Sequence, residues 1–214
     1  MWDEQSTTLE RGVKGVFGSI VSEDEIQRNG AQTVKRLETL VGIRPTDIDL
    51  EIGCGIGRVG GALAPRCSKW IGTDISSNMI RLASHRLKNL RNIELVTLGL
   101  GGLKEIASES VDIVYCTVVF MHLFEWDRYR YVKEAYRVLV RGGRCYFDNV
   151  DITSDGGWKV FTDGCSLEPS KRPAHISMNS TGEELLTYAT RAGFADAKVH
   201  RFDNTWVAVT GIKT

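Results

Sequence analysis

The most distinctive feature of this chain is a glycine-rich stretch that directly follows an apolar run. Residues 50–58 read LEIGCGIGR, with glycine at positions 53, 55 and 57. Glycine loses more conformational freedom on folding than any other residue, so this cluster indicates positive φ angles or a ligand that lies against the main chain. Where a strand leads into a helix through such a turn, free backbone N–H groups and the helix N-terminus face the ligand. The stretch therefore predicts a ligand-binding turn.

An acid follows at the end of the next β-like run. Asp74 closes the stretch KWIGTD, and in open α/β sheets ligands bind at the carboxyl ends of the strands. A carboxylate in that place can accept hydrogen bonds from both hydroxyls of a ribose. Together the two motifs predict a ligand that contains a nucleoside, and they leave open which one.

Two patterns favour a nicotinamide-dependent oxidoreductase as the competing interpretation. Residues 55–60, GIGRVG, match the G-x-G-x-x-G dinucleotide fingerprint. Tyr129 and Lys133 have the Y-x-x-x-K spacing of short-chain dehydrogenases, with Thr117 near the place of their serine. However, Tyr129 continues into a helical apolar stripe, which is typical of a helix packed on a core. A long helical segment also precedes the first strand, so we expect Tyr129 to be a packing residue.

The composition indicates a folded protein without a dominant electrostatic partner. The 214 residues are 42% hydrophobic and 25% charged, which is ordinary for a globular domain and too apolar for a disordered one. Lysine plus arginine equals aspartate plus glutamate at 27 each. Neither a nucleic acid nor an anionic membrane is therefore the expected main partner. The five cysteines form no C-x-x-C pair, and with four scattered histidines they predict no metal site.

Targeting signals are absent from the patterns of this sequence. The longest apolar run, Ile113–Met121, is far shorter than the about 20 residues that a spanning helix needs. The start, MWDEQSTTLERG, lacks the basic and apolar regions of a secretory signal. Free thiols suit a reducing compartment. We expect a cytoplasmic protein without a membrane partner, and no pattern indicates its oligomeric state.

Short β-like runs alternate with helical ones from Thr46 onward. This alternation predicts a doubly wound, Rossmann-like α/β sheet with helices on both faces, because parallel strands need helical crossovers. The fourth run is apolar almost throughout and is therefore expected to be a central strand. The predicted strands lie at 47–52, 69–74, 92–98, 110–120 and 143–150, with helices near 57–66, 76–89 and 126–140.

The chain is expected to form one domain of four parts. Residues 1–42 have helical spacing and predict an N-terminal cap, and 43–150 hold the ligand-binding core. Residues 151–180 show little periodicity and predict a lid or substrate segment, since loops this long are usually functional or mobile. In 181–214, a capping box starts a helix that Gly193 ends. The stretches AKVHRF and TWVAVTGI then predict an antiparallel hairpin.

In this order, the motifs resemble those of the class I S-adenosylmethionine-dependent methyltransferases, particularly the small-molecule branch of type 11 and ubiquinone/menaquinone-type enzymes. The resemblance covers residues 43–150 closely and the C-terminal segment in pattern only. Five motifs carry it: Glu51-Ile-Gly-Cys-Gly-Ile-Gly57 with Arg58, Gly72-Thr-Asp74-Ile-Ser, Ser110-Val-Asp112-Ile-Val, His122-Leu123, and Glu134-Ala-Tyr-Arg-Val-Leu-Val-Arg-Gly-Gly143.

The resemblance implies a seven-stranded sheet, mostly parallel with an antiparallel C-terminal strand, and S-adenosyl-L-methionine as the cofactor. It assigns the methionine end to Glu51 and the three glycines, the ribose to Asp74, and the adenine face to Ile75 and Met79. The other cofactor contacts implied are Cys54, Arg58, Gly99, Leu100 and Thr117. Gly99 departs from the family, which usually has an acid there that reads the adenine amino group. Adenine recognition is then expected to use backbone groups or water.

The implied reaction is methyl transfer to a hydroxyl or amine of a small metabolite. In-line transfer depends mainly on orientation, and a general base helps an acceptor that must lose a proton. His122, after the fourth strand, and His175, in the 151–180 segment, are the candidate bases, while Trp158 and Phe161 either line an acceptor pocket or anchor the lid.

Two further alternatives remain besides the oxidoreductase. Residues 117–120, TVVF, stand where base-modifying amino-methyltransferases carry Asn/Asp-Pro-Pro-Tyr/Phe. A nucleic-acid methyltransferase is therefore a less favoured alternative. A protein that binds the cofactor without catalysing transfer is the other, supported only by the missing acid at Gly99.

Overall fold

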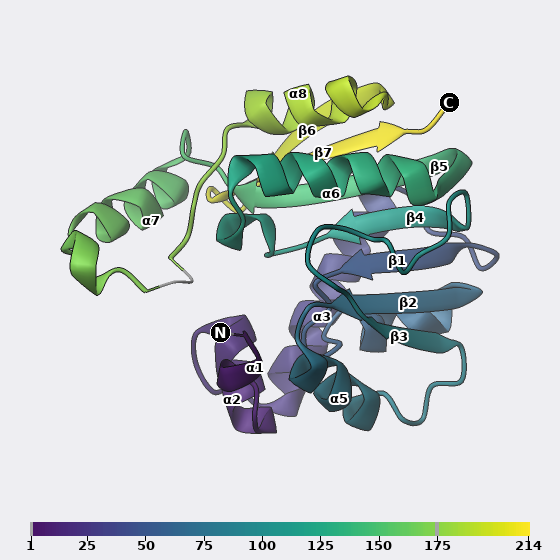
Figure 1. Ribbon diagram of the computed structural model, residues 1–214, viewed down its shortest axis with the longest axis horizontal. Coiled ribbons are helices and arrows are strands. Elements are labelled where there is room, and N and C mark those ends of the chain that lie inside the picture. Colours follow the sequence, from purple (N-terminus) through teal and green to yellow (C-terminus); the bar gives the residue numbers. More distant parts are fainter. Residues whose placement is uncertain (1, 174–175) are drawn as a thin grey trace.

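A seven-stranded sheet forms the centre of the computed structural model, which describes residues 2–173 and 176–214 (Figure 1). The strand order is β3-β2-β1-β4-β5-β7-β6. Only β7 is antiparallel to its neighbours β5 and β6, which confirms the predicted mostly parallel sheet with an antiparallel last strand. The strands are β1 (Ile48–Ile52), β2 (Lys69–Asp74), β3 (Ile93–Thr97), β4 (Val111–Cys116), β5 (Leu139–Val150), β6 (Ala195–Phe202) and β7 (Trp206–Ile212).

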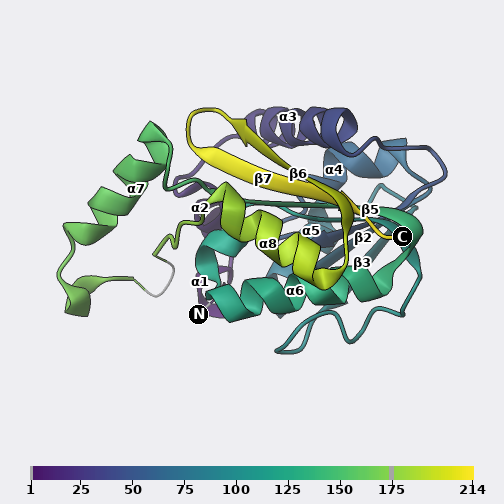
Figure 2. The ribbon, with the colours of Figure 1, turned by 90° about the horizontal axis from the view of Figure 1, so that it is seen from above.

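Helices cover both faces of this sheet (Figure 2). Helices α6 and α8 lie on one face, and α3 and α4 on the other. The α-helices are α1 (Trp2–Gln5), α2 (Leu9–Phe17), α3 (Glu23–Leu40), α4 (Gly60–Leu63), α5 (Ser77–Arg86), α6 (Glu125–Val138), α7 (Asp155–Cys165) and α8 (Gly182–Ala192), and the 3₁₀ turns are η1 (Ala64–Arg66), η2 (Phe120–His122) and η3 (Pro169–Lys171).

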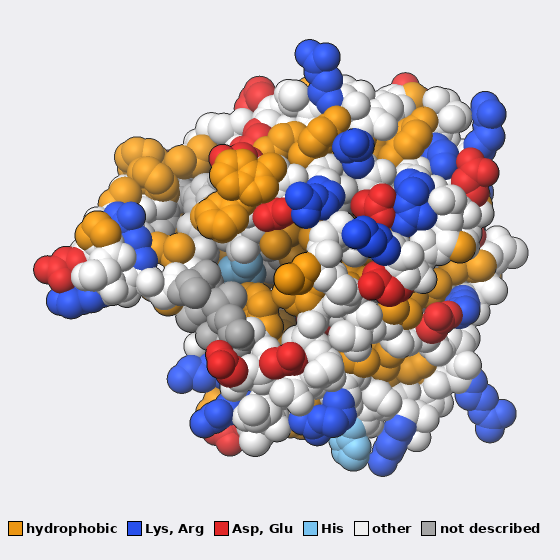
Figure 3. All heavy atoms as spheres, in the orientation of Figure 1, with side chains coloured by type: hydrophobic (Ala, Val, Ile, Leu, Met, Phe, Trp, Pro, Cys, Tyr) orange, Lys and Arg blue, Asp and Glu red, His pale blue; other side chains and the backbone are white. Residues whose placement is uncertain are grey.

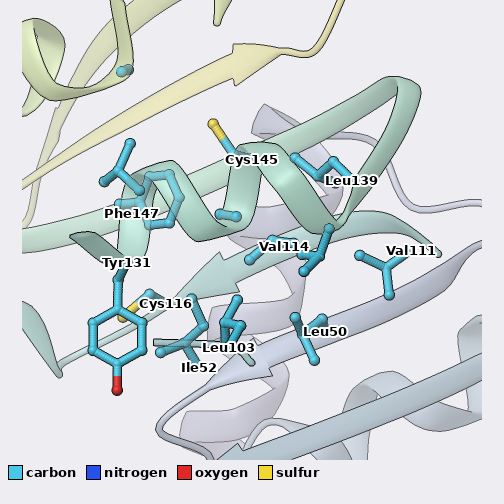
Figure 4. Close-up of a cluster of buried hydrophobic side chains, with 14 of the residues drawn as sticks. Leu50, Ile52, Leu103, Val111, Val114, Cys116, Tyr131, Leu139, Cys145 and Phe147 are labelled. Atoms are coloured by element: carbon cyan, nitrogen blue, oxygen red, sulfur yellow. The ribbon is translucent and has the colours of Figure 1, made fainter. Parts of the chain in front are cut away.

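The alternation of side chains along the central strands divides the core into two layers. Leu50 and Ile52 of β1 pack with Val114 and Cys116 of β4 beneath α6 (Figure 4). The intervening residues face α3 and α4, and they include the buried carboxylates of Asp49 and Glu51. Both faces of β1 and β4 are thus covered, as a central parallel strand requires.

The N-terminal cap is attached to the carboxyl edge of the sheet through α5. The Oδ1 atom of Asp3 accepts hydrogen bonds from the Ser76 hydroxyl at 2.7 Å and from the Asn78 backbone N–H at 3.1 Å. Asp3 therefore lies at the N-terminus of α5, where a carboxylate is favourable. Ser76 also caps this helix by accepting the Met79 N–H. The cap thus lies directly beside the end of β2.

The 151–180 segment contains a helix that the sequence pattern did not reveal. Ser154 caps α7 by accepting the Gly157 N–H, and the helix then extends away from the body (Figures 1 and 2). The three glycines of α7 disfavour a helix, and its large apolar residues Trp158 and Phe161 are exposed, so the sequence did not indicate a helix packed on the core. The return segment is anchored where the Met178 N–H donates to the Met121 carbonyl at 2.7 Å.

Tyr129 is a packing residue, as expected. Its hydroxyl donates to the Arg191 carbonyl of α8, and its ring lies 5.7 Å from that of Tyr188. The Lys133 Nζ atom lies 6.0 Å from the centre of the Tyr129 ring. The Tyr-Lys pair therefore faces α8 rather than the ligand edge of the sheet, which removes the main support for a short-chain dehydrogenase. Within the described ranges, no helix is long and apolar enough to cross a membrane.

Candidate cofactor and acceptor site

A cavity of about 330 Å³ lies at the carboxyl edge of the sheet, beneath the N-terminal cap. The ends of β1, β2 and β4 form its floor, and α2 contributes Gly15, Val16 and Phe17 to its wall. Its size falls in the range of small-molecule sites. The sequence-predicted residues that line it are Glu51, Gly53, Cys54, Gly55, Arg58, Asp74, Ile75, Met79, Thr117 and His122.

Three of the predicted residues that the structure describes are not part of this lining. Gly57 lies behind the turn, and the loop after β3 contributes Leu98 rather than Gly99 or Leu100. His175 lies outside the described residues. Of the two candidate bases, His122 is therefore the one that the described structure brings to the cavity.

Contacts within the protein, and not only a ligand, require glycine in this turn. Gly53 and Gly57 have φ of 73° and 74°, a left-handed conformation that favours glycine. A Cβ atom at Gly53 would overlap the Val119 side chain, and one at Gly57 would lie 2.7 Å from the Leu87 Cδ1 atom. Two of the three motif glycines are therefore required by packing of the loop after β4 and of the end of α5.

Asp74 connects the glycine turn to the start of α5. Its Oδ2 atom accepts the Gly55 N–H and its Oδ1 atom the Ser76 N–H, both at 2.9 Å. Only 9% of the residue is exposed, and burial raises the pKa of the carboxyl against the opposing effect of these hydrogen bonds. A carboxylate has about four acceptor sites, so Asp74 retains the capacity to accept hydroxyl groups from a ligand in the cavity.

Glu51 lies deeper in the floor, at the end of β1. It accepts a hydrogen bond from the Tyr115 hydroxyl at 2.8 Å, and that hydroxyl in turn accepts the Trp70 indole N–H at 2.8 Å. Burial raises the pKa of Glu51 to about 8. The carboxyl therefore exchanges a proton near neutral pH, and a cation that enters the cavity would favour its charged form.

The buried guanidinium of Arg58 lies near Glu51. Arg58 donates from Nη1 to Asn29 Oδ1 at 2.7 Å and to Thr33 Oγ1 at 2.8 Å, and from Nη2 to Thr117 Oγ1 at 3.2 Å. These acceptors are all neutral oxygens. Since arginine keeps its charge in proteins, Arg58 supplies a positive charge at the cavity floor that suits a ligand carboxylate.

The loop after β4 is strained where it borders the cavity. Val118 has φ of 61°, a conformation that costs a residue with a Cβ atom about 1–2 kcal/mol. Its N–H donates to Asp148 Oδ1 at 2.8 Å, and Asp148 also accepts the Tyr146 hydroxyl at 3.1 Å. Burial raises the pKa of Asp148 to about 6. This anchored turn brings Val118, Val119 and η2 to the cavity.

His122 lies at the end of η2, between the cap and the cavity. Its ring is 5.2 Å from that of Trp2 in an edge-to-face arrangement, and both residues line the cavity. The backbone N–H of His122 donates to the Val119 carbonyl at 2.9 Å. The imidazole is therefore placed by the β4 loop on one side and by α1 on the other.

Several lining residues were missed by reasoning from the sequence. The helical spacing of Val16 and Phe17 predicted only a cap, whereas these side chains form part of the cavity wall. Tyr131 of α6 is 8% exposed and turns its hydroxyl away from the apolar cluster around it (Figure 4). Burial raises its pKa to about 12. No local pattern marks Tyr131 or Trp206, because tertiary packing alone brings them here.

The loop at Gly99 holds a carboxylate from elsewhere in the chain. The Gly99 N–H donates to Glu105 Oε1 at 2.9 Å, and a Cβ atom at Gly99 would lie 3.2 Å from the same oxygen. A carboxylate thus lies beside Gly99, although Glu105 is not among the residues that line the cavity. This arrangement was not expected from the sequence.

Comparison with known proteins identifies the family of the domain that contains the cavity. Residues 50–147 match the family model described as a methyltransferase domain. The matched range is a class I S-adenosylmethionine-dependent methyltransferase domain. The cavity lies at the carboxyl edge of its sheet, and the matched range contains the glycine turn, Asp74 and His122.

The sequence relatives of the methyltransferase domain include an uncharacterized protein and an O-methyltransferase. An uncharacterized 37.1 kDa protein in a transposon of Streptomyces fradiae is 32% identical over 162 residues, covering 71% of this chain and 44% of that protein. A ubiquinone biosynthesis O-methyltransferase of Idiomarina loihiensis is 27% identical over 103 residues, covering 48% of this chain and 42% of the enzyme. The chain thus spans less than half the length of these two relatives.

Solved structures share the fold over most of the chain. The magnesium protoporphyrin IX methyltransferase of Synechocystis, with bound S-adenosylhomocysteine (SAH), has a TM-score of 0.73 at 18% identity and covers 99% of this chain and 97% of its own. A possible histamine N-methyltransferase of Thermotoga maritima has a TM-score of 0.67 at 22% identity, covering 89% and 92%. At these identities the likeness establishes the fold.

The residues of the cavity fit S-adenosylmethionine. Asp74 can accept ribose hydroxyls, Arg58 can pair with the methionine carboxylate, and Glu51 can accept from the ammonium group. Ile75 is 41% exposed and borders the cavity together with Met79, which provides an apolar surface for adenine. The described residues contain no group of three or more His, Cys, Asp or Glu side chains that could hold a metal ion.

Proposed function

We propose that this chain transfers the methyl group of S-adenosylmethionine to a hydroxyl or amine of a small metabolite. The observation that carries the proposal is that nine of the twelve predicted cofactor residues and His122 line one cavity. The cofactor supplies a methyl group that its sulfonium has already activated. The protein then needs mainly to orient an acceptor, which can contribute about 7–11 kcal/mol to the rate.

Different residues of this chain bind the cofactor, exclude water and accept the proton. Asp74 holds the nucleoside, while Glu51, Arg58 and the glycine turn hold the methionine end. Val118, Val119 and Leu123 line the cavity with apolar side chains that exclude water. His122 accepts a proton at an imidazole nitrogen from the acceptor's hydroxyl or ammonium group. Such base catalysis typically contributes about 10²–10⁴-fold.

A small acceptor is supported by the shape of the site and by its relatives. The cap borders the cavity with Trp2, Val16 and Phe17, which leaves room for a metabolite more readily than for a base within a nucleic acid. The relatives include a ubiquinone biosynthesis O-methyltransferase and a magnesium protoporphyrin IX methyltransferase. The proposal places the protein in the cytoplasm, as a single domain, without nucleic acid as its substrate.

The test separates the alternatives that remain. Calorimetric titration with S-adenosylmethionine, SAH and NAD should show binding of the first two only. Incubation with cofactor labelled in the methyl group and a metabolite extract should then label a small molecule. Binding without label transfer would indicate a non-catalytic binding protein, and preferential binding of NAD would contradict the cofactor assignment.

A further inference from the structure

Exposed apolar side chains are concentrated around the mouth of the cavity. Of the ten exposed large hydrophobic residues in the described part of the chain, nine belong to the N-terminal cap or to the segments that follow β2, β3, β4 and β5. These segments all lie at the carboxyl edge. The tenth, Ile212, pairs with Arg144 at the opposite edge of the sheet. A random distribution of solvent-exposed apolar groups would not favour one edge so strongly, and such patches mark binding surfaces.

Two stacked aromatic pairs form the largest part of this surface. Phe124 and Trp126, at the start of α6, are 55% and 61% exposed, and their ring centres lie 5.5 Å apart. Trp158 and Phe161, on α7, are 55% and 39% exposed, with ring centres 5.3 Å apart. We call these four residues the apolar rim. Each pair offers a flat aromatic surface to solvent.

The Phe124–Trp126 pair of the apolar rim adjoins the cavity, and hydrogen bonds tie the segment that returns from α7 to the same loop. Leu123 lines the cavity, and Phe124 directly follows it in the chain. The return segment of α7 is bonded to the same loop, because the Met178 N–H donates to the Met121 carbonyl and Arg128 donates to the carbonyls of both Phe120 and Met178. Figure 3 shows apolar side chains gathered over the start of α6 and over α7, beside a hollow in the surface.

We propose that the acceptor has an extended apolar portion that lies on the apolar rim while its reactive hydroxyl or amine enters the cavity. This inference rests on the proposed function and specifies its substrate class. A compact polar metabolite would leave the rim in water, whereas an alkyl, prenyl or polycyclic portion would cover it. The charged groups Asp74, Arg58 and Glu51 lie in the cavity floor and are assigned to the cofactor, and His122 contacts the reactive group, so the remainder of the acceptor gains affinity through apolar contact.

The inference predicts how affinity depends on chain length. The test uses n-alkyl esters of 4-hydroxybenzoate, from methyl to dodecyl, titrated by calorimetry with and without saturating SAH. Each methylene that reaches the rim should tighten binding by up to about fourfold. The variant Phe124→Ser/Trp126→Ser should flatten this dependence, and Trp158→Ser/Phe161→Ser should flatten it for the longer chains. Ile212→Ser removes an exposed apolar side chain at the opposite edge and is the matched control.

The outcomes distinguish this inference from the proposed function. Affinity that does not change with chain length in the parent, or a dependence that survives in both rim variants, would overturn the inference. So would sedimentation showing that the parent is an oligomer that rim substitutions dissociate, because a second copy would then cover the rim. Failure of the parent to bind SAH would contradict the proposed function alone, since the ester series is also measured without it.

Discussion

At the scale of single residues, the site has two buried carboxyl groups, Asp74 and Glu51, that are proposed to bind different parts of the cofactor. Asp74 accepts two backbone N–H groups at the turn, whereas Glu51 accepts the hydroxyl of Tyr115, and burial raises the pKa of both carboxyls, that of Glu51 to about 8. Hydrogen bonds to a carboxylate favour its charged form and burial disfavours it. The backbone donors therefore oppose the effect of burial at Asp74, and the Tyr115 hydroxyl opposes it at Glu51.

Removing the Asp74 carboxylate should weaken the cofactor and its product equally. Asp74→Ala is expected to reduce the affinity for S-adenosylmethionine and SAH by about 1.5–3 kcal/mol, since both present the same ribose to a charged acceptor. Calorimetry measures both losses. Asp112→Ala is the matched control, because the Asp112 carboxylate also accepts a backbone N–H, that of Ile48, at the amino edge of the sheet. Unchanged affinity in Asp74→Ala would show that this acid does not hold the ribose.

The role of His122 can be separated from that of a structural histidine. His122→Ala should lower the single-turnover rate by about 10²–10⁴-fold and leave SAH affinity nearly unchanged, because the imidazole acts on the acceptor. His200→Ala serves as the control, since His200 bonds Thr210 within the β6–β7 hairpin. If the His122 variant retained more than about a tenth of the parent rate, the loss would be too small for base catalysis.

At the scale of elements, the cavity depends on how α2 is seated against the core. Gly12 faces α5 and the glycine turn so closely that a Cβ atom would lie 2.8 Å from Leu82 Cδ1 and 3.1 Å from Ile56 Cγ2. The same helix carries Val16 and Phe17 into the cavity wall. The close seating of α2 therefore requires a small residue at position 12.

Enlarging that residue should displace the cap without unfolding the sheet. Gly12→Val is expected to cost about 1–3 kcal/mol through overpacking and to weaken SAH binding, because α2 carries part of the wall. Chemical unfolding and calorimetry measure the two effects. Lys14→Ala is the control, because Lys14 is exposed on the same helix and is not among the residues that line the cavity. Equal SAH affinity in Gly12→Val and the parent would mean that the cap is not part of the binding site.

At the scale of the whole molecule, a buried acid links stability to pH. Asp49 of β1 is fully buried, and its two carboxylate oxygens have no hydrogen-bond partner among the residues that the structure describes. Burial, and next the nearby Asp47, raise its pKa to about 7. The unfolded chain should have the ordinary aspartate value of about 3.9. The folded state therefore holds a proton that the unfolded state releases.

This difference predicts the direction of the pH effect. The contribution of protonated Asp49 is fully present below about pH 4 and is lost as the pH rises to about 7, at about 1.4 kcal/mol for each pH unit. Asp49→Asn stays neutral, so its free energy of unfolding relative to the parent should increase over this window and then level off. Urea unfolding from pH 4.5 to 8 measures it. Glu10→Gln, which removes one exposed charge, is the control, and a flat difference for Asp49→Asn would contradict the prediction.

The fold and the centre of the site could be predicted from the sequence because their signals are local. The alternation of β-like and helical runs predicted the mostly parallel sheet, since each element carries its own periodicity. The glycine turn and Asp74 come directly after β1 and β2, and the topology of a parallel sheet brings strand ends together at one edge. His122 was found in the same way, as a residue that follows β4.

The rest of the site was decided by tertiary structure. Tyr131 and Trp206 reach the cavity from a helix and from a distant strand, and only the packing of those elements determines which side chains meet there. Glu105 occupies the space beside Gly99 because the loop folds back on itself. Helix α7 escaped prediction because its glycines disfavour a helix and its large apolar residues are exposed. Hydrophobic periodicity indicates which face of a single helix or strand is buried, whereas contacts between distant elements produce no periodic pattern in the sequence.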